Sequence, residues 1–395
     1  MPGPLVSLKV LDFSTLLPGP YTSMVLADLG AEVLRVESPT RPDMVRHFPP
    51  SDGTTSAAHA QLNRNKRSLA LDLKKPESPE IVQRLVADYD IVLEQFRPGV
   101  MDRLKVGYEE LRQHNPALIY CAITGYGQSG PLRDRAGHDI NYLALSGVSD
   151  ASRRCGEAPV PWGIQVADVA GGAHHAVMAI LAAEVHRQQS GEGQYLDVSM
   201  TDAVFAMQAL SGASALSGGT PPAAESWQLN GGSLYDFYET QDGRWMSVGS
   251  LEPQFLQRLL AVLEIEPPPG LAPHDAESQK VLKSAIRKRF LERSQKEWCV
   301  LFGQVDACVE PMLSFDEALE QPQLNSRELV VEVPDAKGTT RKQLASPLRF
   351  SQTPPHYRHT GSAVGEHTIE VLSELGYSDE KIQDFLKDGA AHQSS

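Results

Sequence analysis

The first 125 residues alternate between short apolar runs and amphipathic stretches, and this alternation constrains the fold more than any other feature. The apolar runs predict buried strands at Leu8–Phe13, Glu32–Glu37, Ser68–Leu73, Ile91–Glu94 and Leu118–Ile123. Helical stretches lie between them, among them Tyr21–Leu29 and Ile81–Asp88. Strands that alternate with helices build a mostly parallel sheet with helices on its faces. We therefore expect an α/β fold with a Rossmann-like large domain.

Turn-forming residues follow several of these strands. Pro18-Gly19-Pro20 comes after the first, Phe96-Arg97-Pro98-Gly99 after the fourth and Gly125-Tyr126-Gly127 after the fifth. Parallel sheets bind ligands at the carboxyl ends of their strands, so we expect the ligand there. No Gly-x-Gly-x-x-Gly follows the first strand, which argues against a nicotinamide or flavin site.

The remainder of the chain predicts a second, smaller domain. A helix over 168–188, a strand over 194–198 and a helix over 201–210 complete the large domain, residues 1–210. Glycine, serine and proline mark residues 211–232 as a linker. Residues 233–325 begin with a hairpin around Gln241-Asp242-Gly243 and continue as helices, which predicts a small α+β domain. Residues 326–395 form a return segment whose C-terminal helix is expected to pack on the large domain.

Composition excludes several classes of function. The chain of 395 residues has a formal net charge of −14, which argues against binding to nucleic acid or to an anionic membrane surface. No run approaches the ~20 apolar residues of a spanning helix, and the N-terminus has no basic, apolar signal pattern. The four cysteines form no Cys-x-x-Cys pair, so we expect reduced thiols, no metal and a cytoplasmic location.

Two segments carry the residues best suited to chemistry. His138 lies in Gly137-His138-Asp139-Ile140-Asn141-Tyr142, and Asp168 lies 30 positions later, in a stretch rich in small residues. An imidazole and a carboxylate can move protons between them, and the carboxylate alone can act as a nucleophile. The alternative is that each is a surface or helix-capping residue, as most histidines and aspartates are.

The chain resembles the class III CoA-transferase (CaiB/BaiF) superfamily over essentially its full length. Within that superfamily it most resembles the α-methylacyl-CoA racemases. The motifs that carry the resemblance are Pro18-Gly19-Pro20 with 24–31, Lys66-Arg67-Ser68-Leu69, Phe96-Arg97-Pro98-Gly99, 137–142, 248–255, Glu297-Trp298-Cys299, Asp306-Ala307-Cys308 and Gly365-Glu366-His367-Thr368.

The resemblance implies an interlocked homodimer. Each active site would lie between the large domain of one subunit and the small domain of its partner. Coenzyme A would bind the large domain as part of the substrate, with no prosthetic group. The positions that match the family's CoA contacts, with Tyr126 added from the turn after the fifth strand, are Arg35, Leu73, Lys74, Phe96, Arg97, Arg103 and Tyr126. Arginine and lysine suit the phosphates of CoA, which agrees with this set.

The resemblance also implies two possible reactions. In a racemase of lipid metabolism, Asp168 and His138 exchange protons at the α-carbon of a 2-methylacyl-CoA thioester, and Glu252 supports His138. Backbone N–H groups at the start of the helix near Asp168 are expected to stabilise the enolate. In a CoA-transferase, Asp168 instead attacks the thioester and forms an acyl-aspartyl anhydride that CoA then opens.

Two features of the sequence bear on this choice. The transferases carry a glycine-rich loop in the small domain, whereas this chain has Gly249-Ser250-Leu251-Glu252-Pro253-Gln254. Against the racemase, Ile164 stands where that family has an asparagine four residues before the aspartate.

A CoA-binding protein that has lost its chemistry would lack at least one of His138, Asp168 and Glu252, and all three are present. Nothing in the sequence suggests a pure interaction protein. Met200, Met207 and Trp227 either line an acyl pocket or belong to the core.

Overall fold

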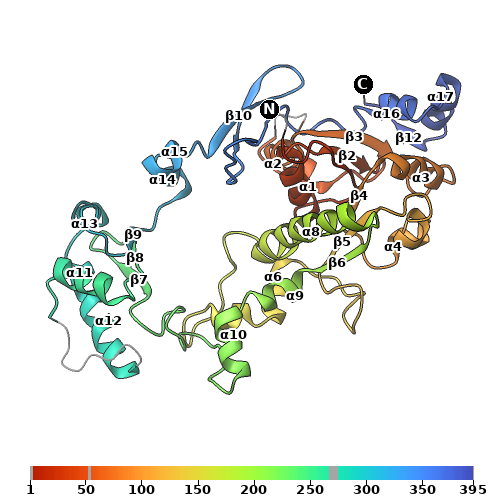
Figure 1. Ribbon diagram of the computed structural model, residues 1–395. Helices are drawn as coiled ribbons and strands as arrows, with labels where there is room; N and C mark the ends of the chain where they lie inside the picture. The colour runs from red at the N-terminus through yellow and green to blue at the C-terminus, as the bar shows by residue number, and fades with distance from the viewer. Residues whose placement is uncertain (1–2, 52–54, 267–274, 395) are drawn as a thin grey trace. The chain divides into compact units, whose positions relative to one another are not determined.

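The computed structural model describes residues 3–51, 55–266 and 275–394, which divide into two compact units (Figure 1). Unit 1 comprises residues 1–143, 163–204 and 327–395, and unit 2 comprises residues 144–162 and 205–326. The division falls within two helices, α6 (Asp139–Leu145) and α9 (Met200–Ala206). No helix among the described residues is long and apolar enough to cross a membrane.

Unit 1 is built on a sheet with the order β12-β3-β2-β1-β4-β5-β6. All neighbouring strands are parallel except the edge strand β12, which runs antiparallel to β3. The strands are β1 (Lys9–Asp12), β2 (Glu32–Glu37), β3 (Lys66–Leu71), β4 (Ile91–Glu94), β5 (Ile119–Thr124), β6 (Tyr195–Ser199) and β12 (Ala391–His392). The order 3-2-1-4-5-6 is that of a doubly wound sheet, which reverses direction between β1 and β4. The predicted α/β class is therefore correct.

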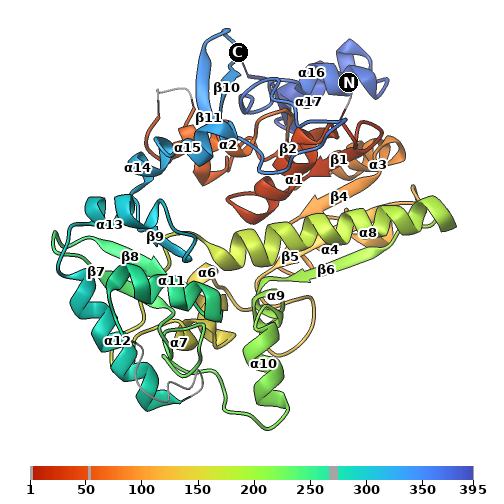
Figure 2. The same ribbon diagram turned by 60° about the vertical axis from the view of Figure 1, so that its left-hand side comes forward.

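Helices cover both faces of this sheet, so the central strands are almost continuously apolar and buried. One face packs against α3 (Ser78–Asp88), α4 (Val100–Arg103), α5 (Tyr108–Leu111), α16 (Thr368–Glu374) and α17 (Asp379–Lys387). The sheet also contacts α1 (Pro18–Asp28), the π-helical turn η2 (Ala167–His174) and α8 (His175–Ser190). Figure 2 shows α8 running along β5 and β6. The remaining elements of unit 1 are η1 (Met44–His47), α2 (Ala57–Leu62) and the hairpin β10 (Val330–Pro334) and β11 (Thr340–Leu344).

Several boundaries differ from those predicted. Helix α1 begins at Pro18 rather than Tyr21, because a proline fits the first helical turn, where its missing N–H has no partner to lose. Strand β3 spans Lys66–Leu71 rather than Ser68–Leu73. Its first residue, Lys66, is buried and bonded to other polar groups, an arrangement that apolar periodicity does not reveal.

Unit 2 has its own sheet and core. Antiparallel strands β7 (Asp236–Glu239), β8 (Trp245–Val248) and β9 (Val309–Pro311) pack with α11 (Pro253–Leu263), α12 (Ala276–Phe290) and α13 (Gln295–Phe302). The core contains Tyr238, Phe290 and Trp298, whose rings contact one another in sequence. The other helices of unit 2 are α7 (Val148–Ala151), α10 (Ala209–Leu216), α14 (Phe315–Leu319) and α15 (Pro322–Ser326).

The segment that we expected to be a linker, 211–232, is helical at its start. Helix α10 continues to Leu216, since its alanines and leucines favour a helix despite Gly212. Residues 144–162, placed by sequence with the large domain, cluster with unit 2, and the return segment from Arg327 clusters with unit 1.

Candidate active site

Two adjoining cavities open at the carboxyl ends of the parallel strands of unit 1. The first, here the β2–β3 cavity, has a volume of about 790 Å³ and is lined by the ends of β2 and β3 and by residues 13–16 after β1. The second, here the β4–β5 cavity, has a volume of about 290 Å³ and is lined by residues 95–98 after β4 and 123–126 after β5. Both are lined by Leu16 and Phe96. They therefore lie where the strand order reverses, the usual ligand position in such a sheet.

His138 and Asp168 both line the β4–β5 cavity. His138 immediately precedes α6, and Asp168 lies in the first turn of η2. The carboxylate of Asp139 connects the two segments, because its Oδ1 accepts the backbone N–H of Ala167 at 2.6 Å and of Asp168 at 3.0 Å. The backbone N–H groups of Ala167 and Asp168 therefore already have an acceptor. The prediction that free N–H groups at the start of this helix stabilise an enolate is wrong for these two groups.

The pKa of the Asp168 carboxyl is raised to about 6. Burial is the main cause, and the negative charge of Asp139 adds to it, while His138 acts in the opposite direction. No hydrogen bond involves the Asp168 side chain within the described part of the chain. The carboxyl group can therefore both accept and give a proton near neutral pH.

Local hydrogen bonds hold the segment that carries His138. The backbone N–H of His138 donates to Oδ1 of Asn141 at 3.0 Å, and the hydroxyl of Tyr142 donates to the carbonyl of Gly137 at 2.6 Å. The ring of Tyr142 packs edge-on against that of Tyr126. The imidazole itself is exposed, and it faces the cavity from a fixed backbone.

The residues expected to contact CoA divide between the two cavities. The β2–β3 cavity is lined by Arg35, Leu73, Lys74, Phe96 and Arg103, and the β4–β5 cavity by Phe96, Arg97 and Tyr126. All seven are in unit 1, around one continuous edge of the sheet. Met200, an acyl-pocket candidate, also lines the β4–β5 cavity, whereas Met207 and Trp227 are in unit 2.

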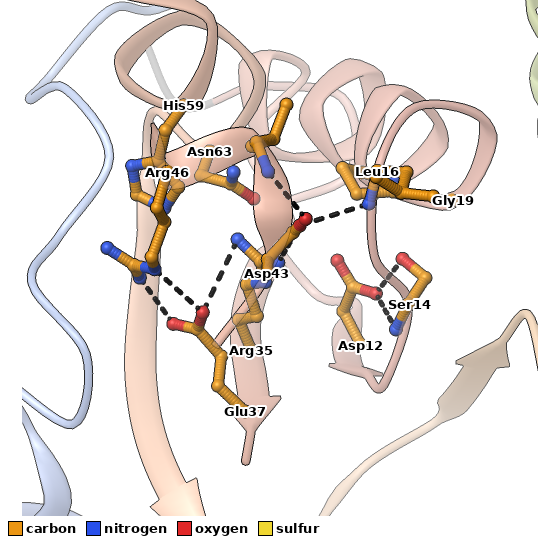
Figure 3. A network of polar contacts seen from close by, with 12 residues as sticks. Asp12, Ser14, Leu16, Gly19, Arg35, Glu37, Asp43, Arg46, His59 and Asn63 are labelled. Atoms are coloured by element: carbon orange, nitrogen blue, oxygen red, sulfur yellow. Dashed lines mark hydrogen bonds and ion pairs between the residues drawn. The ribbon is translucent and has the colours of Figure 1, made fainter. Parts of the chain in front are cut away.

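Arg35 differs from the other cationic residues of this set because it is buried in a network of ion pairs (Figure 3). Its guanidinium contacts Asp43 at 2.5 Å and Glu37 at 3.7 Å, and Arg46 holds the other side of Glu37 at 2.6 Å. Burial favours a high pKa for the Glu37 carboxyl, but Arg35 and Arg46 outweigh burial and lower it. Arg35 therefore supports the wall of the β2–β3 cavity as part of a neutralised cluster.

Glu252 is in unit 2, at the residue that caps the N-terminus of α11. Proline follows at the first helical position, and the Glu252 side chain makes no capping hydrogen bond. Its carboxylate therefore makes no hydrogen bond to the first turn of α11, and its role beside His138 stays a prediction. No group of three or more His, Cys, Asp or Glu side chains within the described ranges is arranged to hold a metal ion.

The model of CoA-transferase family III matches residues 5–368. The chain belongs to CoA-transferase family III. The α-methylacyl-CoA racemase of Mus musculus is 38% identical over 384 residues, 96% of this chain and 95% of the relative.

Family III relatives of this chain differ in their reactions. The succinate–glutarate CoA-transferase of Agrobacterium fabrum is 33% identical, over 94% of this chain and 96% of the relative. A solved CAIB/BAIF family protein from Brucella suis superposes with a TM-score of 0.80 at 27% identity, over 95% of this chain and all of the other. Membership of family III therefore establishes the fold and places the chain among enzymes. It does not choose between racemase and transferase.

Three residues near the candidate site were not among those predicted from the sequence. Asp139 was noted only as a neighbour of His138, although a carboxylate next to a candidate base was a usable signal. Arg133 and Arg135 line the β4–β5 cavity and lie within four residues of Gly137. Their contribution depends on how the loop 126–137 folds back, which no periodic pattern predicts.

Proposed function

We propose that this protein is an acyl-CoA racemase that inverts the α-carbon of 2-methylacyl-CoA thioesters by 1,1-proton transfer. The observation that carries the proposal is that two proton carriers, Asp168 and His138, line one cavity beside the strand edge expected to bind CoA. The raised pKa of Asp168, about 6, suits a group that must accept and give protons near neutrality.

In the proposed reaction one of the two groups removes the α-proton while the other delivers a proton to the opposite face. Either can start, so both enantiomers are substrates. Glu252, supplied by the small domain, would orient the imidazole and stabilise its protonated form. Asp139 keeps Asp168 in place through the backbone bonds to Ala167 and Asp168.

The test is isotope exchange. One enantiomer of a 2-methylacyl-CoA is incubated with the protein in D₂O, and the α-proton is followed by NMR. We expect deuterium uptake with formation of both epimers, and loss of this activity in His138→Ala and Asp168→Asn. His186→Ala removes an exposed histidine of α8 and serves as the control that keeps full activity. Absence of exchange in the unaltered protein would refute the racemase.

CoA transfer is the second candidate, and one observation favours it. The Asp168 carboxylate has no hydrogen-bond partner among the described residues, so an oxygen is available to attack a thioester. A transferase would exchange CoA with labelled free acids and would form an adduct on Asp168 that hydroxylamine traps. It would lose activity in Asp168→Asn and keep it in His138→Ala, the opposite of the racemase pattern at position 138.

We also propose that the protein acts as a homodimer. On unit 1, Met178 and Val185 are about half exposed on α8, seven residues apart and so on one side of the helix. Unit 2 exposes Trp162, Phe205, Leu210 and Leu216. Large apolar side chains exposed on one side of a helix, as Met178 and Val185 are, are typical of surfaces that a partner covers. A second copy is the occupant that an interlocked dimer would provide.

A further inference from the structure

Leu16 and Phe96 line both cavities at the carboxyl edge of the sheet, and no other described residue is shared between the two. The β4–β5 cavity contains His138 and Asp168, but its volume of about 290 Å³ lies at the lower end of the range for drug-sized ligands, about 300–1,000 Å³. A CoA thioester that reacts there must therefore extend into the β2–β3 cavity. The route between the two cavities passes Leu16 and Phe96.

A buried carboxyl group holds the backbone at each of these two residues. Oδ2 of Asp43 accepts the N–H of Leu16 at 3.0 Å, and Oε2 of Glu94 accepts the N–H of Phe96 at 2.7 Å. Both carboxyl groups belong to side chains that are only 5% exposed. Figure 3 shows Asp43 bonded to Leu16, whose φ of 62° lies in the left-handed region that leucine rarely adopts. Asp43 also pairs with Arg35, whereas Glu94 makes no second hydrogen bond within the described part of the chain.

The segment that follows β4 is held from two sides. Glu94 is the last residue of the strand, and its carboxyl group reaches forward to Phe96. Gln95, between them, accepts the backbone N–H of Gly19 at 2.8 Å and so ties the segment to the first turn of α1. The ring of Phe96 packs on the core of unit 1. The place of Phe96 at the boundary of the cavities thus depends on the side chain two residues before it.

Glu94 is a costly residue for a contact that serves the fold alone. It forms no ion pair with any residue that the structure describes. Burial raises its pKa to about 8, the N–H of Phe96 acts in the opposite direction, and the charge of Asp102 adds to the effect of burial. Burying an ionisable group is unfavourable, and such groups in the wall of a cavity are candidates for a functional role.

We propose that Glu94 is a positioning residue: by holding Phe96 at the boundary of the two cavities, it aligns an acyl-CoA that occupies both. This rests on the proposed function in one respect, that the reacting carbon lies beside His138 and Asp168. The nucleotide part of CoA then occupies the β2–β3 cavity. Alignment at the boundary uses the binding of that part to place the thioester correctly.

The experiment separates alignment from the binding of the nucleotide part. Glu94→Gln keeps an oxygen that can accept the N–H of Phe96, and Glu94→Met fills a similar volume without an acceptor. Adenosine 3′,5′-bisphosphate and an unreactive S-alkyl thioether of CoA are titrated by calorimetry. The unaltered protein and Glu94→Gln should bind the thioether more tightly than the bisphosphate. In Glu94→Met we expect the affinity for the thioether to fall about ten- to a hundredfold, with that for the bisphosphate within about twofold of the native value.

Turnover gives a readout that a general loss of stability does not reproduce. Isotope exchange is measured on a 2-methylacyl-CoA and on the same acyl group carried by pantetheine, which lacks the nucleotide part. In Glu94→Met, kcat/KM should fall about ten- to a hundredfold for the CoA thioester and stay within about twofold for the pantetheine thioester.

Glu366→Met is the matched control. Oε2 of Glu366 accepts the backbone N–H of Ala363 at 2.7 Å, in unit 1 but outside both cavities. The control loses the same kind of hydrogen bond and should match the unaltered protein in both assays.

Three outcomes would overturn the proposal. Equal losses on the CoA and pantetheine thioesters would assign the effect to damage within the β4–β5 cavity, and the absence of any loss would leave Glu94 without a role. A Glu94→Gln variant as impaired as Glu94→Met would assign the effect to ionisation rather than to the hydrogen bond. If Glu94→Met does not fold, the unaltered protein still provides a test, because a thioether that binds no more tightly than the bisphosphate would show that the two parts are not aligned.

The two assays also separate this inference from the proposed function. The expected binding pattern without isotope exchange in the unaltered protein would retain the inference and refute the racemase. Isotope exchange in the unaltered protein, with thioether binding and turnover unchanged in Glu94→Met, would retain the racemase and refute the inference.

Discussion

Oδ1 of Asp139 accepts the backbone N–H of Asp168 at 3.0 Å, while the charge of the same carboxylate raises the pKa of the Asp168 side chain. One residue thus sets both the position and the ionisation of the candidate acid–base group. It is next to His138 in the sequence, so both proton carriers depend on the short segment that opens α6.

Asp139→Asn is expected to separate these two effects. The amide oxygen can still accept the two N–H groups, but the negative charge is gone, so the pKa of Asp168 falls below about 6. The acid limb of the rate profile against pH should move to lower pH by up to about one unit. Asp139→Ala also loses the capping bonds and should lower stability by about 1 kcal/mol. A profile that stays in place in Asp139→Asn would contradict the electrostatic role.

Asp168→Asn is expected to stabilise the protein most at alkaline pH. The folded-state pKa of Asp168 is raised to about 6, above its value in the unfolded chain, so the folded state prefers the protonated form. The resulting stabilisation is complete below the unfolded pKa and is lost as pH rises through about 6. Asparagine does not ionise, so the gain over the native residue in urea unfolding should be larger at pH 8 than at pH 5 by about 1 kcal/mol.

Glu37→Ala is expected to be severely destabilising. It leaves Arg35 and Arg46 without a shared carboxylate in a buried cluster, and breaking such a pair costs about 3–5 kcal/mol. The matched change Glu80→Ala removes an exposed partner of Arg84 and should cost less than about 1 kcal/mol. Urea denaturation of both variants provides the comparison, and similar losses would argue against the cluster as a structural element.

Met178→Glu with Val185→Glu is expected to weaken the proposed dimer, because each change places a charge on the apolar side of α8. Light scattering coupled to size-exclusion chromatography should show a shift toward the monomer. The control His186→Glu adds a charge at an exposed polar position of the same helix, about 100° around the axis from Val185, and should leave the mass unchanged. A monomeric native protein would refute the dimer at the outset.

The parallel sheet, and the edge of the sheet at which its two cavities open, were predictable from local patterns. Strands β2 and β4 match their predicted spans residue for residue, because short runs rich in valine, leucine and isoleucine and bounded by turns favour buried strands. His138 and Asp168 line one cavity, as two groups that act together must, whereas the proton transfer between them stays a prediction.

The tertiary structure alone decided which groups act on one another. Lys66 starts β3 because Pro20 and Asn63 satisfy its ammonium group, and burial lowers its pKa to about 8. Asp139 modifies Asp168 because the chain returns to it 29 residues later. The side chains of Arg103 and Arg133 both approach Gly99. Periodicity reports which side chains leave water, whereas hydrogen bonds and charge interactions depend on distances between segments remote in sequence. For this reason the sequence by itself determined the layers of the fold and the kinds of residue at the carboxyl edge of its sheet, and the folded chain determined the partners and the ionisation of those residues.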